Sequence, residues 1–208
     1  MEFVAVTVAG VGRRYLLAGT SSAVGQPVVI VLHGTGGTAA WADDETGWSA
    51  VAAREGFALA IPEGLPPDPH KPPKFLTNPQ RWTEGTEDVE FLSTVIADVL
   101  RRASGDPRRV YLTGFSNGAA MAFRFAAERA ELLAAVAPVA GYCEVPDPKP
   151  SRPVPTLTVI GTADPLVPLR GGPVRLPWGG RLVDRPPVAE SLERWAKALG
   201  CSPVPEVV

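Results

Sequence analysis

The stretch Arg109-Val-Tyr-Leu-Thr-Gly-Phe-Ser-Asn-Gly118 decides the fold. Its apolar start predicts a strand over 109–113, and the residues that follow predict a helix over 119–130. Between them, Gly114-x-Ser116-x-Gly118 predicts a tight strand-to-helix turn that holds a serine in a strained backbone, with its hydroxyl above the sheet. A Cβ at either glycine is expected to collide with neighbouring backbone. Ser116 is therefore the candidate nucleophile; the alternative is a serine that only caps a helix after a glycine turn.

Strands and helices alternate on both sides of this turn. The alternation predicts an α/β fold, in which a mostly parallel sheet carries helices on both faces. At 208 residues the chain is expected to form one domain, 1–208. The expected strands cover 3–8, 13–17, 27–32, 57–61, 109–113, 134–139 and 156–160, and the expected helices cover 48–55, 87–102, 119–130 and 188–199. The proline clusters at 62–79, 146–155 and 165–187 are expected to be loops.

The composition is that of an ordinary globular protein, and the formal net charge is −2. This balance, without any basic run, argues against a nucleic-acid partner or an anionic membrane surface. No apolar stretch approaches the ~20 residues needed to span a bilayer. The first residues lack the basic and apolar regions of a signal peptide, so the chain is either intracellular or begins after a removed signal. Its location stays open.

The loop His33-Gly-Thr-Gly-Gly37 directly follows a strand expected to be buried on both faces. In a serine-based site, one donor to the developing oxyanion is the backbone N–H after the nucleophile, here that of Asn117, and the second comes from this loop. We choose the Thr35 N–H as the second donor, with Gly36 as the near alternative. We expect the His33 ring to brace the loop by hydrogen bonding, because it belongs to the wrong loop for a base.

Asp164 is the candidate acid of the site. It lies in Gly161-Thr-Ala-Asp-Pro165, after the strand expected at 156–160, and this fits the chain order of serine, then acid, then histidine. Its carboxylate would orient an imidazole and stabilise the charged form of that ring. The alternative is an Asp-Pro turn whose carboxylate caps its own backbone.

A histidine after Asp164 is missing from the sequence. The chain has two histidines, His33 and His70, and both precede Ser116. Three interpretations stay open: the chain is a fragment of a longer enzyme that lacks its last strand and helix, His70 has taken over as the base, or the protein is inactive. A missing last strand would leave 156–160 as an unprotected edge, so we expect a homo-oligomer that covers this edge.

Two tryptophans and two cysteines complete the candidates. Trp82 lies shortly before the helix expected at 87–102 and Trp41 lies after the glycine loop, so each is a candidate for stacking on substrate, with a core role as the alternative. Cys143 and Cys201 either pair or stay free, and their spacing does not suit a metal site. The chemistry outlined above requires no metal and no organic cofactor.

Seven segments together resemble the polyhydroxybutyrate depolymerase and feruloyl esterase group, including the LpqC-type esterases. They are Leu32-His-Gly-Thr-Gly-Gly37, Pro62-Glu-Gly, Arg81-Trp82, Asp88-Val89-x-Phe91-Leu92, Arg109 to Gly118, Ala137-Pro-Val-Ala-Gly141 and Gly161-Thr-Ala-Asp-Pro165. The resemblance covers nearly the whole chain. It implies the α/β-hydrolase fold, with a closing strand and helix that this sequence lacks.

The resemblance also implies a function. It points to a serine esterase that hydrolyses polyester, short acyl or hydroxycinnamoyl esters through an acyl-enzyme, with Ser116 and Asp164 in the roles given above. Members of the group place the histidine in a Gly-His-x-Trp-Pro-like segment beyond the acid, which is absent here, so impaired activity is expected. The alternatives from other classes are a non-catalytic binding protein of the same fold, a peptidase and an acyl transferase.

Overall fold

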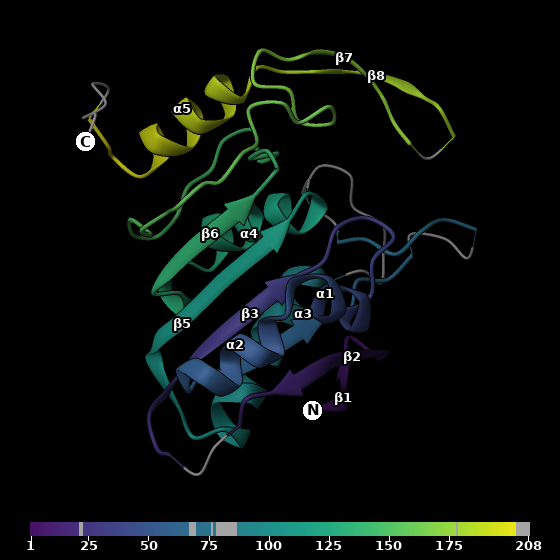
Figure 1. Ribbon diagram of the computed structural model, residues 1–208. Coiled ribbons are helices and arrows are strands. Elements are labelled where there is room, and N and C mark those ends of the chain that lie inside the picture. The colour runs from purple at the N-terminus through teal and green to yellow at the C-terminus, as the bar shows by residue number, and fades with distance from the viewer. Residues whose placement is uncertain (21–22, 67–69, 76, 78–86, 178, 203–208) are drawn as a thin grey trace.

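A six-stranded mixed sheet forms the centre of the molecule (Figure 1). The computed structural model describes residues 1–208 except 21–22, 67–69, 76, 78–86, 178 and 203–208. Its main sheet has the order β1-β2-β4-β3-β5-β6. β1 and β2 pair antiparallel, as do β2 and β4, whereas β4, β3, β5 and β6 are mutually parallel neighbours. The strands are β1 (Glu2–Val8), β2 (Val11–Ala18), β3 (Gln26–Leu32), β4 (Ala58–Pro62), β5 (Gly105–Phe115) and β6 (Ala135–Val139). The predicted mostly parallel sheet is confirmed.

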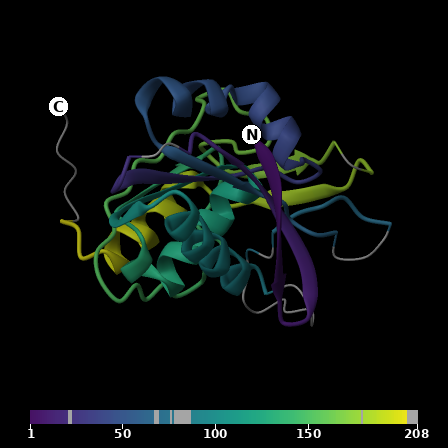
Figure 2. The ribbon, with the colours of Figure 1, turned by 90° about the horizontal axis from the view of Figure 1, so that it is seen from below.

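Helices cover both faces of this sheet, as predicted. Figure 2 shows helices on both sides of the sheet. α1 and α2 enclose a small core with alternate residues of β2, β3 and β4, whereas α3, α4 and α5 enclose the larger core on the opposite face. The helices are α1 (Ala39–Thr46), α2 (Trp48–Glu55), α3 (Asp88–Arg102), α4 (Asn117–Glu128) and α5 (Val188–Ala198), with a 3-10 turn at Ala130–Leu132. No helix of the described residues is long and apolar enough to cross a bilayer.

The β1–β2 hairpin is joined to the rest of the molecule by a buried ion pair. Its two-residue turn has positive φ at both positions, 49° at Ala9 and 80° at Gly10, as this class of hairpin turn requires. Arg13 of β2 then contacts Asp88 at the start of α3 at 2.8 Å, with both side chains at most 2% exposed. The Arg13 guanidinium also lies 3.9 Å from the centre of the Phe91 ring. These contacts hold the hairpin against α3.

The structure differs from the prediction at the carboxyl-terminal third. Part of the proline-rich segment at 165–187 is not loop but an antiparallel pair, β7 (Gly172–Arg175) and β8 (Leu182–Arg185). Pro173 is tolerated because both strands of a two-stranded ribbon are edges. The strand expected at 156–160 is reduced to isolated parallel bridges, Val136↔Thr156 and Val139↔Val159. α1 was not predicted, since its eight residues show little amphipathic pattern.

Candidate active site

Ser116 lies between β5 and α4 in a backbone conformation that is rare for a residue with a side chain, with φ 56° and ψ −111°. Its N–H donates to the carbonyl of Val139 in β6 at 2.9 Å. The side chain makes no helix-capping hydrogen bond, so the alternative of a simple capping serine lacks its main contact. The strained strand-to-helix turn predicted from the sequence is therefore present.

Glycines make this turn sterically possible. A Cβ on Gly118 would lie 2.3 Å from the carbonyl oxygen of Leu32, and one on Gly114 would lie 2.5 Å from the backbone of Gly118. Real Cβ atoms essentially never approach this closely, so the predicted collisions are confirmed. A third glycine, Gly141 after β6, would place its Cβ 2.6 Å from the Ser116 carbonyl oxygen. Three strand ends thus converge on the backbone around Ser116.

The glycine loop after β3 lies against this turn. A Cβ added to Gly34 would be 3.5 Å from the Cβ of Ser116. Within the loop, the Gly36 N–H donates to Pro73 and the Gly37 N–H donates to Gly34, at 2.8 and 3.1 Å. Among the described residues, the N–H of Thr35 has no protein acceptor, and neither has that of Asn117 at the start of α4. This favours Thr35 over Gly36 as the second oxyanion donor.

His33 braces the glycine loop, as expected. Its Nε2 accepts the Gly64 N–H at 2.9 Å, so the proton is on Nδ1, which donates to the Gly34 carbonyl at 2.7 Å. The ring is buried and lies 4.9 Å from that of Phe75. Burial lowers the pKa of His33 below its usual value. Both ring nitrogens are occupied by backbone groups, which leaves neither to act as a base.

The Asn117 side chain holds the segment after β4, a contact that the sequence analysis missed. Its Oδ1 accepts the Phe75 N–H at 2.7 Å, and its Nδ2 donates to the Phe75 carbonyl at 3.1 Å. Since Pro73 of the same segment accepts the Gly36 N–H, one segment contacts both the glycine loop and the start of α4. No sequence signal marks this pairing, because its partners are 42 residues apart.

Asp164 lies in the turn that follows residues 156–160, the segment that pairs with β6 through isolated bridges. Val159 pairs with Val139, and the Val139 carbonyl accepts the Ser116 N–H. The turn around Asp164 (the acid turn) and the turn around Ser116 (the serine turn) therefore follow neighbouring segments of the sheet at the same end. Oδ1 of Asp164 accepts the N–H groups of Leu166 and Val167 at 2.8 and 2.9 Å. The capping contacts of the alternative interpretation are thus present. The other carboxylate oxygen has no hydrogen-bond partner among the described residues, and it is the one available to an imidazole.

Tyr142 lies between these two turns, and its position was not predicted. It directly follows Gly141, it packs with Val167 of the acid turn, and the Arg185 guanidinium lies 5.6 Å from its ring centre. Its hydroxyl is buried and has no hydrogen-bond partner in the described part of the chain. Burial raises the pKa of Tyr142, and the Asp164 charge raises it further, against the opposing charge of Arg185.

The remaining candidates fall into three groups. Trp41 is 45% exposed in α1 and its ring borders Gly37, so it is open to solvent beside the glycine loop. Trp82 lies outside the described residues. His70 is exposed in an excursion closed by a bridge between Leu65 and Lys74. Cys143 is buried, Cys201 is exposed, and both are free thiols.

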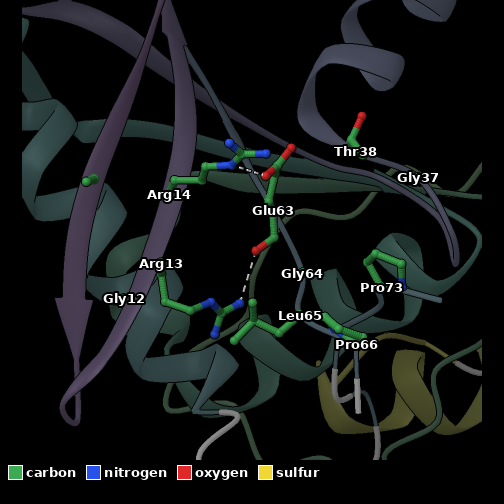
Figure 3. Close-up of a pocket in the computed structure, with 11 residues that line it drawn as sticks. Gly12, Arg13, Arg14, Gly37, Thr38, Glu63, Gly64, Leu65, Pro66 and Pro73 are labelled. Atoms are coloured by element: carbon green, nitrogen blue, oxygen red, sulfur yellow. Dashed lines mark hydrogen bonds and ion pairs between the residues drawn. The ribbon is translucent and has the colours of Figure 1, made fainter. Parts of the chain in front are cut away.

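A hollow of about 470 Å³ lies beside the glycine loop (Figure 3). Gly37 and Thr38 line it from one side, and Arg13 and Arg14 from another. Figure 3 shows Arg14 directed at the Glu63 carboxylate and Arg13 at the Glu63 carbonyl, which it donates to at 3.1 Å. None of its lining residues belongs to the serine turn or the acid turn, so we assign the hollow no part in the reaction.

Several known proteins are similar to this chain in sequence. NocK of Nocardia uniformis subsp. tsuyamanensis, named as an esterase, is 36% identical over 210 residues, which cover 94% of this chain and 59% of NocK. Feruloyl esterase B of Piromyces equi is 27% identical over 86% of this chain and 34% of its own length. The chain therefore spans little more than half of the first relative and a third of the second. A poly(3-hydroxyalkanoate) depolymerase is also among the relatives, and the resemblance inferred from the sequence is confirmed.

The fold has close structural counterparts. The native crystal structure of sOPH matches with a TM-score of 0.73 at 17% identity, covering 95% of this chain and 76% of that one. At this identity the match shows the fold alone, which is that of the α/β-hydrolases. The family model of the dienelactone hydrolase family matches residues 14–171, a range that contains the glycine loop, Ser116 and Asp164. The chain therefore belongs to the dienelactone hydrolase family.

Proposed function

We propose that this protein is a carboxylic ester hydrolase that forms an acyl-enzyme on Ser116. One observation carries the proposal: the strained serine lies against a glycine loop, and the N–H groups of Thr35 and Asn117 lack protein acceptors among the described residues. A serine held in this way beside two available donors suits attack on a carbonyl carbon and stabilisation of the oxyanion that forms.

The reaction would proceed in two steps. Ser116 Oγ attacks the ester carbonyl, its proton passes to an imidazole base, and the alkoxide leaves as the alcohol after taking that proton. Water then attacks the acyl-enzyme with the help of the same base and releases the carboxylic acid. The N–H groups of Thr35 and Asn117 hold the oxyanion in both steps. Asp164 orients the imidazole through the carboxylate oxygen that its own turn does not use.

The base is the group for which this chain offers no clear residue. No histidine follows Asp164, His33 has both nitrogens occupied, and His70 lies exposed in its excursion. Without a base, the oxyanion donors and substrate binding supply a residual acceleration of about 10³–10⁴-fold over water. We therefore expect slow turnover by this chain alone. The same observation supports the second candidate function, a non-catalytic binding protein of this fold.

The substrates we propose are short acyl, hydroxycinnamoyl or polyester esters. The names of the relatives support this range, since they include a feruloyl esterase and a poly(3-hydroxyalkanoate) depolymerase. Trp41, exposed beside the glycine loop, is our candidate for contact with an aromatic or polyester chain, and Trp82 is the second candidate.

Rescue by added imidazole tests this proposal. We expect hydrolysis of p-nitrophenyl acetate by the wild-type chain to rise with imidazole concentration and to level off, while Ser116→Ala follows only the background reaction of imidazole. Mass spectrometry should detect the acetyl group on the peptide that contains Ser116. Equal rates for the wild type and Ser116→Ala at every imidazole concentration would favour the binding protein. Activity without imidazole that His70→Ala abolishes would assign the base to His70.

A further inference from the structure

The β7–β8 pair carries an excess of arginine. Residues 170–185 contain four arginines, one aspartate and no other charged residue, which gives a net charge of +3. Because the whole chain has a formal net charge of −2, the residues outside this segment have a net charge of −5. The arginines are four to six positions apart, so no basic run marks them in the sequence. We call β7, β8 and these arginines the arginine ribbon: Arg170, Arg175, Arg181 and Arg185.

The arginine ribbon lies at the end of the sheet that carries the serine turn and the acid turn. Figure 1 shows it beyond the carboxyl ends of β5 and β6. The guanidinium of Arg185 lies 5.6 Å from the centre of the Tyr142 ring. Tyr142 directly follows Gly141, which lies against the Ser116 carbonyl. The base of the ribbon is therefore connected to the backbone beside the candidate nucleophile.

The arginines of the ribbon differ from the earlier arginines of the chain in their ion pairs. Every described arginine from Arg13 to Arg124 forms an ion pair with a carboxylate. Within the part of the chain that the structure describes, no carboxylate pairs with an arginine of the ribbon. The Nε of Arg185 is buried without a hydrogen-bond partner there, and the other three side chains are exposed. The described residues thus leave the positive charge of the ribbon without a neutralising partner.

The chemistry and spacing of these side chains favour several carboxylates on one chain. Arginine presents its N–H groups as a planar fork that matches a carboxylate with two parallel hydrogen bonds. The Arg181 carbonyl accepts the Leu176 N–H at 2.8 Å, so strand pairing begins one position before β8. By the usual rise of an extended strand, Arg181 and Arg185 are then about 13 Å apart. This separation suits a repeated carboxylate better than a single small anion.

We propose that the arginine ribbon binds an anionic polysaccharide whose sugar units carry carboxylates, and that it presents ester groups of this chain to Ser116. The presentation to Ser116 rests on the proposed esterase function and names its substrate class, an acylated polymer of sugar acids. The binding itself does not depend on that function. Such a polymer carries both groups that the site requires: carboxylates for the guanidinium groups, and hydroxyls whose esters a serine can attack.

Other polyanions fit the ribbon less well. A nucleic-acid duplex or an anionic bilayer would face a wide area of the protein, and the net charge of −5 outside the ribbon would repel it. A flexible polysaccharide chain can contact the ribbon alone. An acidic peptide also offers carboxylates, but it has few hydroxyl groups to carry an ester. The polysaccharide is therefore the occupant that satisfies both the charge and the chemistry.

Calorimetric titration with polygalacturonate tests the binding. We expect the wild-type chain to bind, and the binding to weaken as sodium chloride is added, because salt screens exposed charges. Arg175→Gln combined with Arg181→Gln should raise the dissociation constant at least about tenfold. Arg54→Gln combined with Arg108→Gln is the matched control. It removes the same charge from exposed side chains outside the ribbon and should change the constant by no more than about twofold.

The outcomes of this titration separate the possible partners. No binding, or an equal loss in the two double variants, would overturn the proposal. Tighter binding of poly-L-glutamate than of polygalacturonate would assign the ribbon to an acidic peptide instead. Ser116→Ala should bind polygalacturonate as the wild type does, so the titration reads the ribbon independently of the esterase function.

Hydrolysis with added imidazole at constant ionic strength tests the presentation to Ser116. The readout is the kcat/KM for acetylated polygalacturonate divided by that for p-nitrophenyl acetate, which is neutral. This ratio should fall at least about tenfold in the double variant of the ribbon and stay the same in the control variant. A ratio that falls in both variants or in neither would overturn the presentation. Hydrolysis of neither ester by the wild type would overturn it together with the esterase function, while the titration would still decide the binding.

Discussion

The side chain of Asn117 pairs with both backbone groups of Phe75, at 2.7 and 3.1 Å. Asn117 is also the residue whose own N–H is proposed to hold the oxyanion. One residue thus joins the start of α4 to the segment that fixes the glycine loop through Pro73. The distance between the two proposed oxyanion donors, the N–H groups of Thr35 and Asn117, therefore depends on the contact between the Asn117 side chain and Phe75, in which neither N–H takes part.

Replacing Asn117 by alanine should loosen this connection. The Phe75 backbone groups would lose both partners, and a partly buried pair of this kind costs about 1–3 kcal/mol when left unsatisfied. We expect that decrease in the free energy of unfolding, measured by urea denaturation, together with faster hydrogen exchange of the Phe75 amide. Ser93→Ala is the control, because Ser93 makes only a local contact within α3. An unchanged Phe75 amide would show that the clamp is unimportant.

Ser116 should be a site where glycine stabilises the fold. A residue held in a sparsely populated backbone region costs about 1–3 kcal/mol, and glycine avoids most of that cost. Alanine removes the hydroxyl but keeps the strain. We therefore expect Ser116→Gly to have a larger free energy of unfolding than Ser116→Ala, by about 1–2 kcal/mol after the greater unfolded-state entropy of glycine is counted. A Ser116→Gly variant less stable than Ser116→Ala, by the about 0.4–1 kcal/mol that the entropy of glycine alone costs, would mean that the turn is not strained.

His33 should make stability depend on pH. The buried ring accepts the Gly64 N–H only when neutral, and burial lowers its pKa in the folded protein below the usual 6.5. The unfolded chain therefore binds the proton more readily. The contribution of His33 to stability is complete above pH 6.5 and is lost as the pH falls through the folded-state pKa. We expect the free energy of unfolding of the wild type to fall, relative to that of His33→Gln, from pH 7 down to pH 5. Parallel curves would refute a neutral buried ring.

The buried pair of Arg13 and Asp88 should be costly to break on one side only. Asp88→Ala leaves a guanidinium that is 1% exposed without its anion, and such a loss costs about 3–5 kcal/mol. Arg13→Met with Asp88→Leu removes both charges and should recover most of that loss. Asp106→Ala removes a carboxylate that pairs with the solvent-exposed guanidinium groups of Arg108 and Arg109, and it should lower the free energy of unfolding far less than Asp88→Ala does. A double variant as unstable as Asp88→Ala would count against this account.

Local patterns were enough to predict the centre of the fold. The apolar strand, the glycine turn around Ser116 and the helix after it are contiguous in sequence, so their geometry follows from adjacent residues. The bracing role of His33 was also predictable, because the residue leaves a buried strand. The roles assigned to Ser116, Asp164, Thr35 and Asn117 remain predictions.

The features that sequence reasoning missed depend on distant partners or weak patterns. The clamp between Asn117 and Phe75 joins residues 42 positions apart, and Tyr142 approaches the acid turn only because two strand ends are neighbours. The prolines of 165–187 predict a loop, whereas the structure forms the β7–β8 pair there, because a two-stranded ribbon tolerates proline. The strand expected at 156–160 kept its pairing with β6 but only as isolated bridges.

The bridge between Leu65 and Lys74 closes the excursion that carries His70. Gly64 and Pro73, which hold the glycine loop, lie at the two ends of that excursion, and Phe75 lies just beyond it. Lengthening a loop whose ends are already fixed costs little free energy. The stretch around His70 is therefore where a foreign peptide could be grafted into this protein without altering the spacing of the amides that face Ser116.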